Sequence, residues 1–385
     1  MNQARGEQTV AVLGGGIGGI ALANRLRRKL GTQHRVILVS RDDDFTFAAS
    51  LLWVMTGDRK PEQITRSLQT LKRRGIEVVI GEVEKIDPVN RMVVVSGRNL
   101  AADFLVVSLG AQWASERVPG LVDHGHTFAT LPGAQLLARE LESIDSGRVS
   151  VVTASPLYKC PAAPYEAALL IDAALRRRGV REHVEVVVRS AESTPMPVAG
   201  ANVSSAVEQL MAERDIDYKS SFQITAVEKG LLHFGHDSEQ SDLLVYMPPI
   251  TSPTVIANSA LADSDGWIHA DAQTLETNFA GVFAIGDNTQ IVLKMGKPLP
   301  RAGVFAHAQA LVVAERIFAS ISGKPEIAQF SGNGGCFIET GAGRAAYGSG
   351  NFYAEPAPSI SLHEPARRWH WGKTVFEQNV LRRWL

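Results

Sequence analysis

The spacing of glycines near the N-terminus constrains this chain more than any other feature. Gly14, Gly16 and Gly19 stand in G-x-G-x-x-G spacing directly after the β-branched, apolar run Thr9–Leu13. A helical apolar pattern follows, and residues 36–39 then form a second apolar run typical of a buried strand. This glycine spacing gains meaning only between a strand and a helix. The segment therefore predicts a dinucleotide-binding βαβ unit.

Each glycine has its own physical role in such a unit. The first permits a tight turn, the second lets the backbone approach a pyrophosphate, and the third lets helix and strand pack closely. The helix N-terminus attracts the phosphate charge. An acidic residue about 20 residues further on usually binds a ribose. Here that position is Ser40. A serine still bonds a hydroxyl, but it does not identify the dinucleotide.

Composition excludes several classes of protein. A chain of 385 residues with 45% apolar and 21% charged residues is ordinary for a soluble globular protein of two or three domains. The 39 basic and 40 acidic residues leave no basic excess of the kind that binds nucleic acid. Two cysteines cannot form a disulfide framework or a four-cysteine zinc site, and no metal site is predicted.

A second segment carries a resemblance. Residues 274–287, TLETNFAGVFAIGD, end in Gly286 and Asp287, and a long helical pattern begins near Gly303. The segment resembles the second FAD motif of the pyridine-nucleotide–disulfide oxidoreductases. The resemblance implies that Asp287 holds the ribitol chain of FAD. It also implies that the helix from Gly303 presents its positive end to the isoalloxazine ring.

A third element of the same group precedes this one. Residues 103–110, DFLVVSLG, end at Gly110 and resemble the strand that returns from the middle of an FAD domain. Three such elements in the right order make FAD the predicted cofactor.

The next strand pattern lies where the inserted NAD(P)H domain of that group begins. Residues 149–153 form the strand, but no glycine lies between Ser150 and Arg178. This loop cannot cradle a pyrophosphate closely. Residues 184–188 continue the strand pattern. We therefore expect a Rossmann-like domain that no longer binds a nicotinamide.

Cys160 stands where the glycine loop would be. Pro161 suits the first position of a helix, which places the thiol at a helix N-terminus. The helix dipole and Lys159 would both lower the pKa of that thiol. An inert buried cysteine is the alternative.

The other cysteine, Cys336, lies in a predicted hairpin. A strand over residues 336–340 is followed by a Gly-Ala-Gly turn and a second strand over residues 344–347. Gly334 and Gly335 remove side chains just before Cys336, so another group can approach closely. Taken alone, this is an ordinary strand cysteine.

Together these segments resemble the sulfide:quinone oxidoreductase and flavocytochrome c sulfide dehydrogenase family over nearly the whole chain. The resemblance rests on YKCPAAPYE, VFAIGD, PLPRAGVFAHAQA, Cys336–Phe337 and WHWGKTVFEQNVL. It implies that Cys160 and Cys336 meet on one face of FAD and form a disulfide or polysulfide bridge, and that one of them attacks the flavin. Many quinone reductases of the family have a third cysteine, and the dehydrogenase branch has an export signal. Both are missing here.

The resemblance also implies roles for three further residues. Glu166 matches a glutamate near the flavin that moves protons, with a solvated helix residue as the alternative. Arg301 stands where relatives often have a lysine near the quinone end of the flavin. Phe337 is a candidate wall of the quinone pocket.

The last 25 residues form a basic, tryptophan-rich tail. Residues 361–385 contain five basic and two acidic side chains, and Phe376, Val380 and Trp384 recur at helical spacing. Such a helix suits an in-plane membrane anchor. Docking on the protein's own core or on a second copy is the alternative. With no secretory signal pattern, we expect a protein on the cytoplasmic face of the membrane.

These observations predict an α/β fold with two Rossmann-like domains and a small C-terminal α+β region. The expected parts are residues 1–111 and 262–330 for the FAD domain, 112–261 for the degenerate NAD-type domain and 331–385 for the C-terminal region. The expected reaction is FAD-dependent oxidation of sulfide to sulfur or polysulfide with a membrane quinone as acceptor. Oxidation of another thiol, a persulfide or NADH and a flavoprotein redox sensor are the alternatives, and a homo-oligomer is left open.

Overall fold

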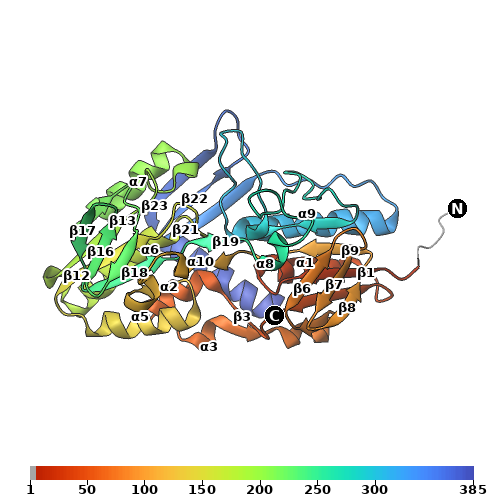
Figure 1. Ribbon diagram of the computed structural model, residues 1–385, viewed down its shortest axis with the longest axis horizontal. Helices are drawn as coiled ribbons and strands as arrows, with labels where there is room; N and C mark the ends of the chain where they lie inside the picture. Colours follow the sequence, from red (N-terminus) through yellow and green to blue (C-terminus); the bar gives the residue numbers. More distant parts are fainter. Residues whose placement is uncertain (1–5) are drawn as a thin grey trace.

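Two lobes with the same layered plan make up most of the molecule in the computed structural model, which describes residues 6–385 (Figure 1). In each lobe a five-stranded parallel sheet has helices on one face and a three-stranded antiparallel sheet on the other. The predicted α/β fold with two Rossmann-like sheets is confirmed. Strands of a parallel sheet that is covered on both faces are apolar along their whole length. The strands of this chain follow that pattern.

The first lobe contains the glycine-rich unit. Its sheet has the order β20-β9-β1-β2-β5. The strands are β1 (Thr9–Leu13), β2 (Arg35–Ser40), β5 (Glu77–Ile80), β9 (Phe104–Val107) and β20 (Val282–Ala284). Helices α1 and α9 cover one face, over Ile17–Lys29 and Gly303–Ser322. The other face is covered by β6 (Val83–Asp87), β7 (Met92–Val95) and β8 (Arg98–Ala101).

The second lobe repeats this arrangement. Its sheet has the order β11-β18-β12-β13-β14. The strands are β11 (His126–Thr127), β12 (Gly147–Thr153), β13 (Val184–Arg189), β14 (Ile216–Lys219) and β18 (Leu243–Met247). The helices are α5 (Leu131–Ser143), α6 (Ala163–Arg178) and α7 (Ala201–Ala212). The opposite layer is β15 (Ala226–Glu228), β16 (Leu231–Phe234) and β17 (Asp237–Gln240).

Short elements connect and border the lobes. Two antiparallel pairs are β3 with β4 (Asp44–Thr46 and Thr65–Ser67) and β10 with β19 (Gln112–Trp113 and Ile250–Thr251). The short helices are α2 (Leu51–Met55), α3 (Pro61–Ile64), α4 (Leu121–His124) and α8 (Thr254–Ala257).

The C-terminal region lies between the two lobes (Figure 1). It is an antiparallel sheet of β21 (Asn333–Gly341), β22 (Arg344–Asn351) and β23 (Ser359–Ala366), followed by α10 (Arg367–Asn379) and a π-helical turn over Val380–Trp384. The predicted hairpin is present, and β23 adds a third strand. A side chain at Gly341 would overlap Ala173 of α6, so glycine lets this sheet pack closely on the second lobe.

Helix α9 is long and apolar enough to cross a membrane by length and composition. In the structure more than half of it is buried, and it packs against α1 in the core of the first lobe. Its contacts are those of a core helix.

Candidate flavin and cysteine site

The glycine loop between β1 and α1 has the geometry of a phosphate cradle. Gly14 has φ +114°, and a Cβ there would overlap the carbonyl of Ser108. A Cβ at Gly19 would overlap the carbonyl of Gly14, whereas one at Gly16 would meet open space. Gly16 therefore leaves the backbone free for a ligand to approach, and α1 begins there with no side-chain cap on its first N–H groups.

Ser40 ends β2 beside this loop. Its hydroxyl donates to the carbonyl of Asp42 at 2.8 Å, and a Cβ at Gly15 would overlap its oxygen. The lone pairs of that oxygen remain for a ribose hydroxyl. Ser40 therefore lies beside the glycine loop.

Asp287 lies where β20 ends, in a turn that begins at Gly286 with φ +77°. Its carboxylate has no hydrogen-bond partner within residues 6–385. Burial raises the pKa of Asp287, and the positive charges of Lys159 and Arg301 oppose that shift. A partly buried carboxylate without a partner fits the ribitol hydroxyls of FAD.

Gly110, at φ +70°, lies beyond the end of β9. Its N–H donates to Oδ1 of Asn288 at 3.1 Å, and Nδ2 of Asn288 donates to the carbonyl of Val107 at 3.3 Å. The sequence reasoning missed Asn288, although it follows Asp287 directly. Helix α9 begins at Gly303 without a side-chain cap. The donors and open backbone of these groups fit FAD.

Cys160 and Cys336 come together although 176 positions separate them. Cys160 precedes α6 with φ +56°, and its N–H donates to the carbonyl of Arg301 at 2.7 Å. Cys336 lies on β21, where its thiol donates to the carbonyl of Phe337 at 3.5 Å, and both residues are free thiols. The interaction between the two thiols raises the pKa of Cys160 and lowers that of Cys336.

The expectation of a low pKa for Cys160 is therefore wrong. The helix begins at Ala163 instead of Pro161, so the thiol is not at its first turn, and burial adds to the upward shift. Lys159 contributes nothing here, because its amine donates to the carbonyl of Ala111 at 3.0 Å and lies 3.9 Å from the centre of the Trp113 ring. Cys336 carries the more acidic thiol.

Glu166 lies in the first turn of α6 and is only 3% exposed. Burial raises its pKa to about 7, although an ion pair with Lys373 and a backbone hydrogen bond from Glu339 oppose the shift. The alternative of a solvated helix residue is wrong. Its charge is close enough to both cysteines to affect their pKa.

Lys373 of α10 is the main residue that the sequence reasoning missed. Burial lowers its pKa, but Glu166 and Glu339 outweigh that effect and raise it. Glu339, on β21, also pairs with His370, with Oε2 and Nδ1 2.8 Å apart. Lys373 and Glu377 lie four residues apart on α10, and both are buried. Their spacing is visible in the sequence, where both residues entered only the net charge of the tail.

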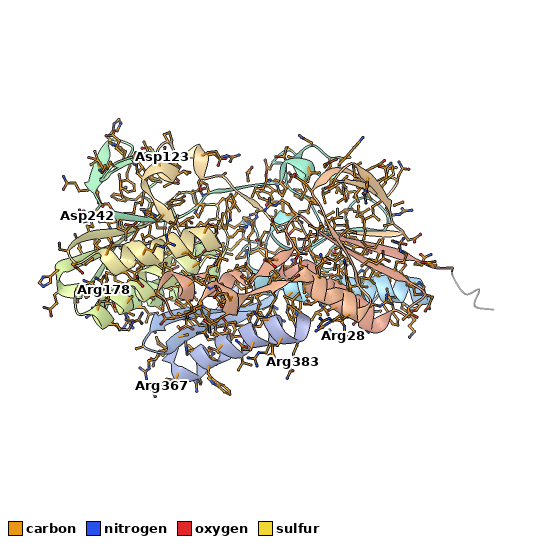
Figure 2. The ribbon with its side chains drawn as sticks, turned by 90° about the horizontal axis from the view of Figure 1, so that it is seen from below. Arg28, Asp123, Arg178, Asp242, Arg367 and Arg383 are labelled. Atoms are coloured by element: carbon orange, nitrogen blue, oxygen red, sulfur yellow. The ribbon has the colours of Figure 1, made fainter. Side chains whose placement is uncertain are left out.

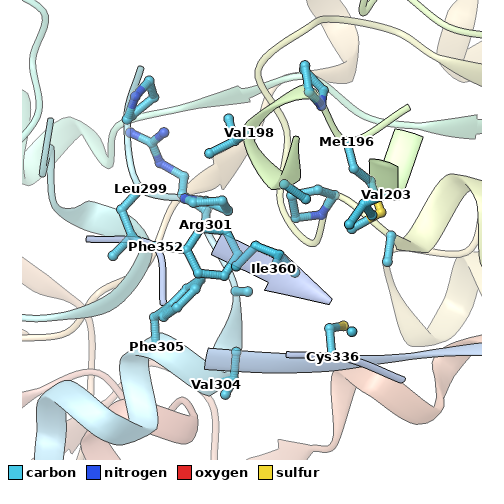
Figure 3. A pocket seen from close by; sticks show the side chains of 18 of the residues that line it. Met196, Val198, Val203, Leu299, Arg301, Val304, Phe305, Cys336, Phe352 and Ile360 are labelled. Carbon is cyan, nitrogen blue, oxygen red and sulfur yellow. The ribbon is translucent and has the colours of Figure 1, made fainter. Parts of the chain in front are cut away.

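A pocket of about 130 Å³ opens beside Cys336 (Figure 3). It has an apolar lining that includes Met196, Val304, Phe305 and Ile360, and Arg301 forms part of its wall (Figure 3). An engineered apolar cavity of about 150 Å³ holds benzene, so this pocket is large enough for a short chain of sulfur atoms.

Phe337 does not line this pocket. Neighbouring side chains on a strand point to opposite faces, and the Phe337 ring lies 4.8 Å from that of Tyr347 and against Gly372 of α10. The two quinone-site candidates, Phe337 and Arg301, therefore do not form one pocket. The guanidinium of Arg301 stacks on Trp267 at 4.0 Å, and its pKa is lowered by burial to about 10.

Comparison with known proteins decides the family. The family model described as pyridine nucleotide-disulphide oxidoreductase matches residues 8–310. The chain belongs to this family. It is 26% identical to a sulfide-quinone reductase of Aquifex aeolicus over 97% of this chain and 90% of that protein. It is 22% identical to a mitochondrial sulfide:quinone oxidoreductase of Mus musculus over 95% of this chain and 83% of that protein.

A solved structure supports the same fold. The sulfide:quinone oxidoreductase from Aquifex aeolicus superposes with a TM-score of 0.89 at 23% sequence identity, over 98% of this chain and 91% of that one. The motif-based resemblance is thereby confirmed. This member of the pyridine nucleotide-disulphide oxidoreductases is an FAD-binding oxidoreductase.

In this family member, two buried tyrosines lie near the carboxyl ends of β12 and β13, the edge of the sheet where a dinucleotide binds in a Rossmann fold. The hydroxyls of Tyr158 and Tyr165 both donate to Glu192, the second at 2.9 Å. Burial raises the pKa of Glu192. Glu192, the acidic residue that could bind a ribose, is thus already hydrogen-bonded to the two tyrosines. The loop that follows β12 has no glycine to let a pyrophosphate approach.

The tail helix docks on the protein. Phe376 packs 5.6 Å from Phe47, Val380 is fully buried, and Trp384 stacks on His307 at 4.7 Å. The helix face that was expected to enter a membrane therefore packs against the protein. This is the alternative in which the tail docks on the protein's own core. Burial lowers the pKa of His307.

A second face of α10, formed by residues other than those that pack on the core, points outward. Trp371 is 71% exposed and Val375 is also exposed. Figure 2 shows Arg367 and Arg383 near the two ends of this C-terminal helical segment, at the rim of the molecule. Trp371 and Val375 therefore form a small exposed apolar patch, with arginines around it, that a partner could contact.

Proposed function

We propose that this chain oxidises sulfide to sulfur or polysulfide at the Cys160–Cys336 pair and passes the electrons through FAD to a quinone. One observation carries the proposal: two free thiols, close enough for each to shift the pKa of the other, lie beside the buried carboxyl of Glu166. The names of the relatives in Aquifex aeolicus and Mus musculus support sulfide and quinone as the substrates.

The thiol pKa values assign the two cysteines different roles in the reaction. Starting from the disulfide, HS⁻ attacks the sulfur of Cys160, the S–S bond breaks, and Cys336 leaves as a thiolate. Besides the Cys160 thiol, the positive charge of Lys373 lowers the pKa of Cys336, and a thiol of lower pKa is the better leaving group. Cys160 then carries the new sulfur as a persulfide.

The second stage returns the pair to a bridged state. The Cys336 thiolate bonds to the outer sulfur of the persulfide as two electrons and one proton leave, which produces a trisulfide bridge. FAD, when bound, accepts these two electrons and delivers them to the quinone. Glu166 accepts the proton, since a pKa of about 7 suits a base near neutral pH. Further sulfide lengthens the bridge or releases polysulfide into the apolar pocket.

The quinone, in this proposal, enters on the Phe337 side of β21, away from the Cys336 pocket. Trp371 and Val375, exposed on α10, would rest on the membrane surface that supplies it. Arg367 and Arg368 would attract anionic lipids. The cytoplasmic face remains a prediction from the sequence.

An anaerobic sulfide titration tests the proposal. Sulfide should bleach the flavin of the wild type, and a quinone added afterwards should restore its colour. Cys160→Ala and Cys336→Ala should retain the flavin spectrum and resist bleaching. Rapid bleaching of both variants would remove the cysteine roles. Bleaching by NADH and not by sulfide would select an NADH oxidase, and slow reoxidation by every quinone would favour a redox sensor.

A further inference from the structure

A line of ionisable side chains runs from the cysteine pair to the surface through three different elements. Glu166 of α6 forms an ion pair with Lys373 of α10. The negative charge of Glu339 on β21 also raises the pKa of Lys373. Glu339 pairs with His370, whose side chain is 32% exposed. The three groups before His370 are buried, so His370 is the place where this line meets water.

Glu339 has a free carboxylate oxygen at the one step of the line that no hydrogen bond of the described residues spans. Its carboxylate is 1% exposed, and only Oε2 has a partner, the Nδ1 of His370 at 2.8 Å. Oε1 is buried and has no hydrogen-bond partner within residues 6–385. An unpartnered buried carboxylate oxygen is costly. It is also a free proton acceptor between Lys373 and His370.

We propose that Glu339 and His370 form the proton exit of the cysteine site, an inference that rests on the proposed sulfide oxidation. Each HS⁻ that becomes sulfane sulfur releases one proton and two electrons. The electrons leave through FAD. The proton goes to the carboxylate of Glu166. Lys373 takes it up while giving one of its own protons to Glu339, and His370 passes a proton on to water.

Each buried member of the line faces charged or titratable groups of the other members. Glu166 faces Lys373, the backbone N–H of Glu339, and both cysteines. Lys373 faces the two carboxyls and lies 4.6 Å from the centre of the Trp53 ring.

His370 also packs on this indole, edge to face with the ring centres 5.6 Å apart, and Arg59 lies 4.5 Å from the centre of the indole ring. Trp53 therefore contacts both Lys373 and His370. Glu339 and His370 act through Glu166 and are positioning residues.

The test measures proton release and flavin bleaching in the same anaerobic stopped-flow mixing of sulfide with holoenzyme, using a pH-indicator dye. Variants are Glu339→Gln and His370→Ala. The matched control is His363→Ala, because His363 stacks on Trp369 at 5.3 Å near the same helix and has no carboxylate partner within the described chain.

In both relay variants, proton release should slow roughly 10²-fold, the low end of the effect of a positioned proton-transfer group. The extent of bleaching should remain that of wild type. Imidazole in the buffer should restore the rate in His370→Ala, and His363→Ala should match wild type.

Three outcomes overturn the relay. One is an unchanged rate of proton release in both variants. Another is slowing that imidazole does not reverse in His370→Ala, which assigns the effect to lost packing on Trp53. The third is equal slowing in His363→Ala. A wild type that sulfide does not bleach would instead overturn the proposed function itself, so the two failures are distinguishable.

Discussion

Lys373 and Glu166 form a buried ion pair across 207 positions of sequence, and this pair joins the C-terminal helix to the helix that follows Cys160. Both side chains are 4% exposed. The tail is therefore a structural part of the cysteine site. Changes to the buried residues of α10 are expected to reach the chemistry directly.

Replacing Lys373 by methionine should leave the carboxyl of Glu166 buried without its countercharge. Breaking a buried pair in this way costs about 3–5 kcal/mol of unfolding free energy. We expect Lys373→Met to lose that amount in urea unfolding of the holoenzyme. The double variant Lys373→Met/Glu166→Gln should recover most of it, and a double variant as unstable as the single one would contradict the pairing.

The raised pKa of Glu166 gives stability a specific pH dependence. The folded protein holds this proton up to about pH 7, whereas the unfolded chain loses it near pH 4.5. The contribution to stability is thus complete below pH 4.5 and lost as pH rises to 7. Relative to Glu166→Gln, the wild type should lose roughly 3 kcal/mol across this window. Parallel stability curves for the two proteins would show that Glu166 has an ordinary pKa.

The two thiols should react unequally with an alkylating agent. Cys336 has the lowered pKa and lines the open pocket, so iodoacetamide should label it before Cys160 near neutral pH. Cys160→Ala removes the neighbouring thiol that lowers the pKa of Cys336. Labelling of Cys336 should then slow about tenfold for each unit by which its pKa rises. Mass spectrometry of the labelled peptides decides the order, and earlier labelling of Cys160 would reverse the assigned roles.

Asp287→Asn should weaken FAD binding, because the unpartnered carboxylate is replaced by an amide. A hydrogen bond to a charged group is worth about 1.5–3 kcal/mol, which corresponds to roughly a 10- to 150-fold loss of affinity. Flavin fluorescence during dialysis measures the loss. Asp265→Asn, at an exposed position of a neighbouring loop, is the control and should retain flavin. Equal retention by the two variants would remove Asp287 from the cofactor site.

Membrane binding should depend on Trp371 and not on Trp384. Trp371→Ala should reduce co-sedimentation with anionic liposomes while leaving the Tm unchanged, because its side chain is 71% exposed. Trp384→Ala should lower the Tm, because its ring stacks on His307. Truncation before Trp369 is a poorer test, since it also removes Lys373. Unchanged liposome binding by Trp371→Ala would leave α10 as a purely internal helix.

Local sequence rules predicted the parts of this protein that depend on neighbouring residues. The turn at Gly14, the close packing at Gly19 and the open backbone at Gly16 follow from the absence of a Cβ, which is visible in the sequence. The start of α9 at Gly303 and the hairpin around Cys336 were predicted in the same way. For the cysteines, the resemblance supplied a pairing that no spacing could have derived.

Tertiary structure decided how the paired groups are charged and which face of the tail is hidden. Helix periodicity placed Phe376, Val380 and Trp384 on one face, but an apolar face fits a membrane and a protein core equally well, and only the position of Phe47 and His307 chose the core. The pKa order of Cys160 and Cys336 likewise depends on burial and on the interaction of two thiols from distant segments. A single glycine or cysteine acts through its own chemistry, whereas Lys373 acquires its role only where Glu166, Glu339 and Trp53 surround it.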